Sequence, residues 1–130
     1  MAQGDVERLQ EIYVAINDAQ DDALLKLLHP DFVYTTREEP ADTGSHLTTD
    51  VLRRVARLKE MFRDVRFEPE EFISAGESVV VVVHGTGLGR VSSAPVDERV
   101  FHVWTFRDAK AVALALYSDR GRAVAAAGPS

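Results

Sequence analysis

The sequence contains no cysteine among its 130 residues. This absence excludes disulfide bonds, a thiolate nucleophile and a metal site with cysteine ligands. Long hydrophobic runs are also absent, since no apolar stretch approaches the roughly 20 residues that span a bilayer. The polar N-terminal segment lacks the apolar core of a signal peptide. We therefore expect a cytoplasmic protein without a membrane partner.

Positive charge is scarce. Lys and Arg number 15 against 21 Asp and Glu, which gives a formal net charge of −6 at pH 7. Because nucleic acids are bound through basic surfaces, we expect no nucleic-acid partner. The length fits one domain over residues 1–130, which is large enough to bury a core without disulfide bonds.

The periodicity of the apolar residues predicts the secondary structure. Helical spacing predicts helices over residues 5–17 and 19–28, and a third that begins at Thr48 or Thr49. Alternation predicts strands over residues 32–37, 65–74, 78–90, 98–108 and 111–118, before a short last helix capped by Asp119. Helices first and antiparallel strands later predict an α+β roll, in which a cone-shaped, curved antiparallel sheet holds three N-terminal helices in its concave face.

The strand over residues 98–108 is the most informative segment. Val100, His102, Trp104 and Phe106 fall on one side of it, and bulky apolar residues also fall on the other. The strand is therefore expected to be central and covered on both faces. A histidine on an otherwise apolar face is typical of a pocket wall and also of a hydrogen-bonded core histidine. In the pocket interpretation, His102 is the acid–base residue, and Trp104 and Phe106 line its cavity.

Other residues are candidates for the same pocket. If the strand face of His84 coincides with that of His102, both imidazoles and the hydroxyl of Tyr34 belong to one catalytic site, with Phe62 in its apolar lining. His84 could instead pack in a dimer interface. Two strand histidines without a placed carboxylate are too few ligands for a metal, so we expect no metal and no cofactor. Residues 38–47 show no periodicity and are expected to form a loop at the pocket rim.

Three segments resemble a known family. They are Leu-Leu-His-Pro-Asp-Phe at 27–32, Phe-His-Val-Trp-Thr-Phe-Arg-Asp at 101–108 and Tyr-Ser-Asp-Arg-Gly-Arg-Ala at 117–123. These segments resemble the nuclear transport factor 2-like superfamily, and more narrowly its SnoaL-like branch, which includes polyketide cyclases. The resemblance covers nearly the whole chain and implies the cone-shaped fold with a small apolar, cyclic or polyketide-like ligand. It does not fix an activity, because this fold hosts isomerases, cyclases, hydrolases and non-enzymes.

The site residues of these relatives transfer only in part. The aspartate base of ketosteroid isomerases falls at Thr36, and their second oxyanion-hole acid falls at His102. Their helix tyrosine falls at Ile12, or at Tyr13 with a shift of one residue. The aspartate of SnoaL-like cyclases falls at Leu116. The resemblance thus implies that Thr36 and Tyr13 contact a substrate, and it leaves both carboxylate positions without an acid or base.

Several local features carry further expectations. Gly85, Gly87 and Gly89 share one strand face and indicate strong curvature or the close approach of another backbone. The family turn Asp-Gly-Lys is replaced by Asp108-Ala109-Lys110, and because alanine is strained at positive φ we expect a different turn type. Epoxide hydrolases of this fold use Asp-Arg-Asp constellations, but we expect Arg90, Asp97 and Arg99 to form a solvated ion-pair cluster. His29 and His46 are not expected to function.

Three functions stay open from the sequence. The first is an isomerase- or cyclase-type enzyme that uses His102, the second is a ligand-binding protein without turnover, and the third is a dimerisation module with a vestigial cavity. A sheet with apolar residues on both faces needs cover on both, and the helices are expected on the concave side alone. We therefore expect a homodimer formed through the outer sheet face.

Overall fold

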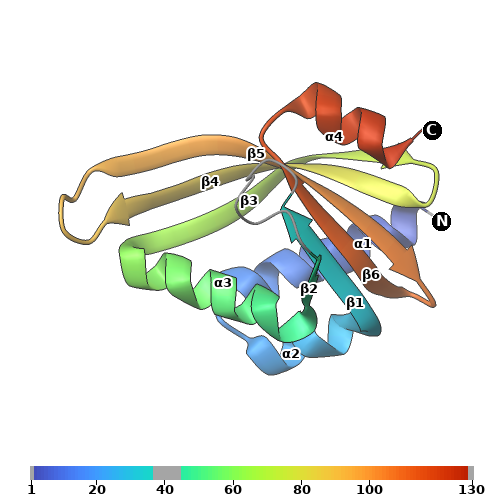
Figure 1. The fold of residues 1–130 in the computed structure, drawn as a ribbon, viewed down its shortest axis with the longest axis horizontal. Helices are drawn as coiled ribbons and strands as arrows, with labels where there is room; N and C mark the ends of the chain where they lie inside the picture. Colours follow the sequence, from blue (N-terminus) through green and yellow to red (C-terminus); the bar gives the residue numbers. More distant parts are fainter. Residues whose placement is uncertain (1, 37–44, 129–130) are drawn as a thin grey trace.

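The computed structural model describes residues 2–36 and 45–128, with side chains for residues 4–33, 52–53 and 55–128. Within these ranges the chain forms helices at the start, six strands and one further helix at the end (Figure 1). In chain order the elements are α1 (Ala2–Asn17), α2 (Asp21–Leu27), β1 (Leu28–Thr36), β2 (Ser45–Leu47), α3 (Thr48–Met61), β3 (Phe62–Ala75), β4 (Ser78–Gly89), β5 (Pro95–Arg107), β6 (Lys110–Tyr117) and α4 (Arg120–Ala127). The α+β class and the order of the predicted elements are confirmed. The short strand β2 lies within residues 38–47, for which only a loop was expected.

The six strands form one sheet in the order β2-β1-β6-β5-β4-β3. Neighbouring strands are antiparallel, as predicted, except for the parallel pair β1 and β6. The three strands β4 to β6 follow one another through short turns, which force antiparallel pairing. Strand β1 joins β6 across the intervening α3 and β3–β5, so no hairpin fixes its direction, and the parallel pairing was not foreseen.

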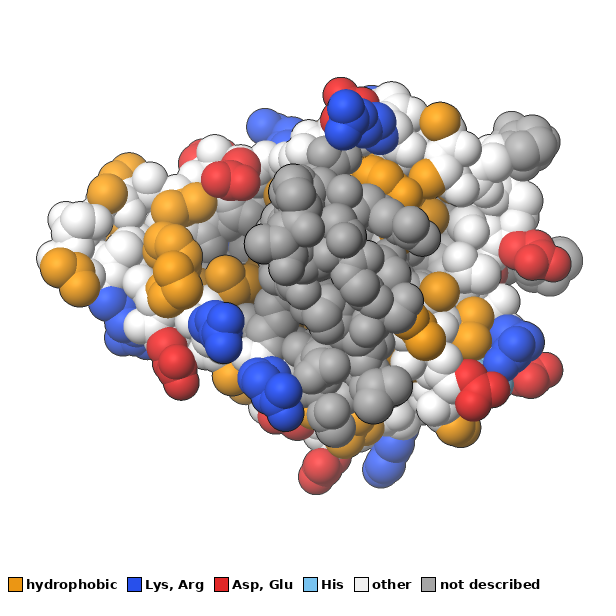
Figure 2. Space-filling view, in the orientation of Figure 1, with side chains coloured by type: hydrophobic (Ala, Val, Ile, Leu, Met, Phe, Trp, Pro, Cys, Tyr) orange, Lys and Arg blue, Asp and Glu red, His pale blue; other side chains and the backbone are white. Residues whose placement is uncertain are grey.

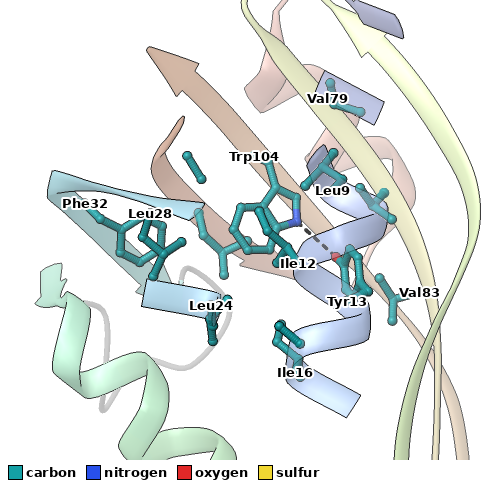
Figure 3. Packing of buried hydrophobic residues seen from close by; sticks show 14 residues of the cluster. Leu9, Ile12, Tyr13, Ile16, Leu24, Leu28, Phe32, Val79, Val83 and Trp104 are labelled. Carbon is teal, nitrogen blue, oxygen red and sulfur yellow. Dashed lines mark hydrogen bonds between the residues drawn. The ribbon is translucent and has the colours of Figure 1, made fainter. Parts of the chain in front are cut away.

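Helices α1, α2 and α3 pack on the concave face of the sheet. The buried core there contains residues from α1 and α2 together with Val79, Val81 and Val83 of β4 and Trp104 of β5, and residues of α3 pack against it (Figure 3). Alternation along β4 turns the intervening Val80 to the other face, where it is fully buried. The long valine run is therefore buried on both sides of the sheet, as expected for a central strand.

Helix α4 covers part of the outer, convex face, which corrects the expectation that helices cover the concave side alone. Ala123 of α4 is fully buried against Val80 and Val103. The helix begins as predicted, because the Asp119 carboxylate accepts a hydrogen bond of 2.8 Å from the backbone N–H of Arg122. Arg120 donates two hydrogen bonds, of 3.1 and 3.0 Å, to the Glu71 carboxylate on β3. This guanidinium holds the pKa of Glu71 below its ordinary value.

The turn between β5 and β6 corrects another expectation. Asp108 and Ala109 both adopt positive φ, of 54° and 65°. Two consecutive residues of this kind are typical of a type I′ turn, whose twist matches that of the flanking strands. The pairing of Arg107 with Lys110 closes this two-residue loop. The family turn type is therefore kept although alanine replaces glycine, and the alanine carries the strain, since a non-glycine residue in this region costs roughly 1–2 kcal/mol.

Strands β3, β4 and β5 extend past α1 and α2 as an arm, with α3 running alongside it (Figure 1). Strand β3 lies at the edge of the sheet and carries an irregularity between Pro69 and Glu71, which are the two settings in which a strand tolerates proline. In the space-filling view, apolar side chains gather along the arm, and basic side chains lie over α3 next to it (Figure 2). None of the helices in residues 2–36 and 45–128 is long and apolar enough to cross a membrane.

Candidate ligand-binding site

A cavity of about 510 Å³ lies where the arm meets the end of α3. This volume falls within the range of roughly 300–1,000 Å³ that is usual for small-molecule sites. Its described lining is mainly apolar and comes from α3, β3, β4, β5 and β6. The lining residues are Leu58, Phe62, Val65, Phe67, Gly85, Thr86, Gly87, Val96, Glu98, Val100, His102, Leu116, Tyr117 and Ser118.

A second, inner cavity of about 70 Å³ continues toward the core. It shares Leu58, Phe67, His102 and Leu116 with the outer cavity, and it reaches the rings of Tyr13 and Trp104. His102 therefore belongs to the wall of both cavities. Hereafter, "the cavity" means the outer one, and His102 marks its inner end.

Two glycines make room for this cavity on the concave side of β4. A Cβ atom added to Gly85 would meet the backbone oxygen of Glu98 at 3.7 Å, which is ordinary contact, and one added to Gly87 would meet side chains at 3.5 Å. Side chains at either position would therefore project into the space that the cavity occupies. Gly89 differs, because its added Cβ would lie 2.7 Å from the side-chain oxygen Ser92 Oγ, whereas the nearest backbone atom, the Ala94 oxygen, would be at an ordinary 3.7 Å.

His102 is held by a chain of hydrogen bonds from the core. The Trp104 indole N–H donates to the Tyr13 hydroxyl oxygen at 2.9 Å, and the Tyr13 oxygen lies 2.6 Å from His102 Nδ1 (Figure 3 shows the first of these bonds). Tyr13 and Trp104 are each 1% exposed. If His102 Nδ1 carried the proton, the buried Tyr13 hydroxyl would accept twice and its own hydrogen would need another acceptor. We therefore assign Tyr13 O–H as the donor to Nδ1.

This assignment fixes the tautomer of the neutral imidazole. With Nδ1 accepting, the ring hydrogen sits on Nε2, so His102 presents a donor rather than a base at Nε2. Burial raises the pKa of Tyr13 well above its ordinary value, while the bond from Trp104 lowers it in part. Tyr13 thus remains a protonated donor at any physiological pH. The Tyr13 and His102 rings also stack, with an angle of 10° between their planes.

His84 does not share this site. Strands β4 and β5 are neighbours, but Val81 lies opposite His102, and His84 lies opposite Arg99 on the outer face. There the His84 Nε2 atom lies 2.6 Å from an Asp97 carboxylate oxygen, and Arg99 donates to Glu70 at 2.7 Å. The condition for a shared site was that the two faces coincide, and they do not. The structure therefore does not bring His84 and His102 together in one cavity.

The expected ion-pair cluster is found on the same outer face. Asp97 and Arg99 are exposed and paired with His84 and Glu70, which confirms the structural interpretation of those two residues. Arg90 is not part of the cluster, because its Nε–H donates to the Lys59 backbone oxygen at 2.8 Å. Within the described part of the chain, no group of three histidine or carboxylate side chains is arranged to hold a metal ion.

The residues predicted to contact a ligand are divided by the structure. Phe62 lines the outer cavity and Trp104 lines the inner one, together with Tyr13. Phe106 lines neither of them, which corrects its assignment. It packs against the same core and borders a hollow near Asp5 instead.

Some predicted residues lie outside what the structure describes. The side chains of Tyr34, Thr36 and His46 are outside the described residues, and only their backbone is placed. Thr36 pairs with Leu116 on the parallel strand. His29 lies near Asp31 and Asp108, with nitrogen–oxygen distances of 3.9 and 3.8 Å, and does not line either cavity.

Glu98 is a site residue that the sequence reasoning did not select. It lines the cavity on the same side of β5 as Val100 and His102. The alternation that placed His102 there also placed Glu98 there, so the signal was present in the sequence. Nothing else in the sequence distinguishes it, because a glutamate near a turn is usually a solvated surface residue.

Comparisons with known proteins relate the chain to one family. Residues 6–114 match the model of the SnoaL-like domain. IdmH from Streptomyces antibioticus, a proposed polyketide cyclase, is 17% identical with a TM-score of 0.78 over 95% of this chain and 96% of that chain. TerC, crystallised with polyporic acid, is 22% identical with a TM-score of 0.73 over 92% and 94% of the two chains. A nuclear transport factor 2-like protein from Burkholderia thailandensis is 24% identical with a TM-score of 0.73 over 95% of each chain. The search of curated proteins found no match.

Proposed function

The chain belongs to the SnoaL-like domain family, and on this basis we propose that it binds a small, largely apolar, cyclic or polyketide-like molecule in the cavity that ends at His102. The observation that carries the proposal is the hydrogen-bonded chain from Trp104 through Tyr13 to His102. It holds one polar group in a fixed orientation and tautomer at the inner end of a mainly apolar cavity. Few, well-placed polar groups in an apolar lining are what orient a ligand in such sites.

The ligand feature that suits this arrangement is an acceptor oxygen. A carbonyl or phenolic oxygen that reaches His102 would accept a hydrogen bond from Nε2–H. Leu116, at the position of the cyclase aspartate, contributes an apolar side chain to both cavities. The lining near His102 therefore favours an aromatic or fused-ring body attached to that oxygen.

Turnover is a second candidate function at the same site. A fixed Nε2–H donor aimed at an oxygen that gains negative charge would lower a barrier by about 3 kcal/mol. Such a reaction also needs a base, and the exclusion of His84 removes the base that the sequence suggested. The primary proposal is therefore ligand binding, with His102 as the donor that orients the ligand. Isomerase- or cyclase-type chemistry would be possible in addition for a substrate that needs no strong base.

The proposal is tested with 2-(hydroxymethyl)anthraquinone as a neutral fused-ring probe with carbonyl oxygens. Trp104 is the single tryptophan of the chain and lines the inner cavity beside His102, so quenching of its fluorescence reports binding directly. We expect the wild type to bind the probe, His102→Ala to weaken binding about fivefold through loss of one hydrogen bond, and His102→Gln, which restores an N–H donor, to stay within about twofold of the wild type.

His84→Ala is the matched control, since it removes the other strand imidazole from the outer face and is expected to leave the affinity unchanged. A folded wild type that does not bind the probe would contradict the proposed ligand class. Equal affinities for wild type and His102→Ala would instead reduce His102 to a structural core histidine.

We further propose a homodimer formed through the outer face of β3–β5 beyond α4. Helix α4 already covers part of this face, so the interface would use the remaining strand surface around His84 and Arg99. Light scattering at micromolar concentration is expected to give twice the mass of the chain, and Arg99→Glu, which places three carboxylates around His84, is expected to shift the equilibrium to monomer. A monomeric wild type would refute the dimer without affecting the ligand site.

A further inference from the structure

We propose that Glu98 is a second ligand anchor, which selects molecules with a hydroxyl or ammonium group at the mouth of the cavity. This inference rests on the proposed function and specifies its ligand. Glu98 and His102 lie on the same side of β5, and both line the cavity. Among the residues described in that lining, Glu98 is the one with a formal charge at neutral pH.

Glu98 differs from the two adjacent residues of β5, whose side chains have partners. Asp97 and Arg99, on the outer face, are engaged by His84 and Glu70. Within the residues that the structure describes, the Glu98 side chain makes no ion pair or hydrogen bond. The residue directly opposite on β4 is Gly85, so no side chain faces Glu98 across the strands. A carboxylate beside an apolar cavity with open space next to it favours a donor or a cation from a ligand.

The distance along the strand decides between binding and catalysis. Glu98 and His102 are four positions apart, and at roughly 3.3 Å per residue their Cα atoms are about 13 Å apart. Because side chains on one face of a strand stand roughly perpendicular to the sheet, their polar ends are expected to stay well separated, too far apart to act on neighbouring atoms of one substrate. They suit the two ends of an elongated molecule, with an acceptor oxygen at His102, a fused-ring body between them and a donor at Glu98. Glu98 is therefore assigned to specificity.

Charge also predicts which ligands are rejected. A carboxylate on the ligand near Glu98 would meet a like charge, in a chain that already carries a net charge of −6. The preference is expected to be moderate, because Glu98 is exposed and its field is screened by water. For an exposed charge of this kind, we expect the affinity for a cationic ligand relative to an anionic one to change about fivefold.

The test uses three matched probes, 2-(aminomethyl)-, 2-(hydroxymethyl)- and 2-carboxy-anthraquinone, with affinities from Trp104 quenching and calorimetry. We expect the wild type to bind the ammonium and hydroxyl probes more tightly than the carboxylate. In Glu98→Gln the ratio of ammonium to carboxylate affinity is expected to fall about fivefold. Glu77→Gln, which removes the same charge at the β3–β4 turn, is the control and is expected to leave the ratio unchanged.

The outcomes separate this inference from the proposed function. If all three probes bind and Glu98→Gln leaves the ratio of ammonium to carboxylate affinity as in the wild type, Glu98 does not discriminate between ligands. The inference is then overturned, while the cavity remains the binding site. If none of the probes binds to the folded wild type, the proposed ligand class and this inference both fall. A fall in the ratio for Glu77→Gln equal to that for Glu98→Gln would show a general charge effect and would also overturn the assignment.

Discussion

Replacing Trp104 by alanine is expected to lower the free energy of unfolding by about 3–5 kcal/mol. The side chain is 1% exposed and is the largest fully buried one. It contacts the rings of Tyr13, Phe32 and His102, so its removal leaves a void that these neighbours cannot close without moving. The Tyr13 oxygen also loses the donor of a 2.9 Å hydrogen bond in a buried environment.

Denaturant unfolding followed by circular dichroism measures this loss, because the variant lacks the fluorescent residue. Trp104→Phe keeps most of the ring volume and loses the N–H, so it is expected to cost less than the alanine variant. Val91→Ala is the control for truncation of an apolar side chain, since Val91 is fully exposed and should contribute almost nothing. A cost below about 1.5 kcal/mol for Trp104→Ala would show that the core around it is loosely packed.

Replacing Gly85 by leucine is expected to weaken binding of 2-(hydroxymethyl)anthraquinone at least about tenfold, which corresponds to about 1.4 kcal/mol. The substitution introduces a branched side chain where the cavity now has open space. The fold should tolerate it, because an added Cβ finds its nearest atom at 3.7 Å and Gly85 does not have positive φ. Glycine in a strand is unfavourable by roughly 0.5–1 kcal/mol, so the variant is expected to be as stable as the wild type or slightly more stable.

A leucine at the preceding residue is the matched control. His84→Leu places the same side chain on the outer face of the same strand and is expected to leave the affinity unchanged. Fluorescence titration and thermal unfolding of both variants distinguish occlusion from misfolding. Retained affinity in a stable Gly85→Leu protein would show that the probe binds elsewhere.

Strand alternation predicted part of the site because the period of a strand is fixed at two. It placed Val100, His102 and Trp104 on one face, and the structure finds all three on the concave side. The same reasoning could not decide whether His84 shares that face. The decision depends on the register between β4 and β5, in which an even-numbered residue lies opposite an odd-numbered one. The hairpin geometry that sets this register is not visible in either strand alone.

The environment of His102 and the turn at Ala109 depend on contacts between distant parts of the chain, which the sequence pattern does not reveal. The sequence alone left a pocket histidine and a hydrogen-bonded core histidine as alternatives, and His102 has features of both, since it bonds to Tyr13 and lines the cavities. The partner is supplied by α1, whose apolar spacing does not reveal which residue meets β5. The type I′ turn at Ala109 was misjudged for a related reason, because a local preference for glycine yields to the twist of the two strands that the turn joins.

The bond between Tyr13 and His102 joins residues 89 positions apart and thereby sets an order of events during synthesis. At translation rates of 5–20 residues per second, Tyr13 leaves the ribosome roughly 4–18 s before His102. Strands β3 and β4, which also pack against α1, emerge within that interval, but the Tyr13 hydroxyl lacks its β5 partners until the end of it. Contacts of such sequence separation also slow refolding, because the intervening loop must close before they form. His102 is therefore oriented only once α1 and β5, which lie far apart in the chain, have met.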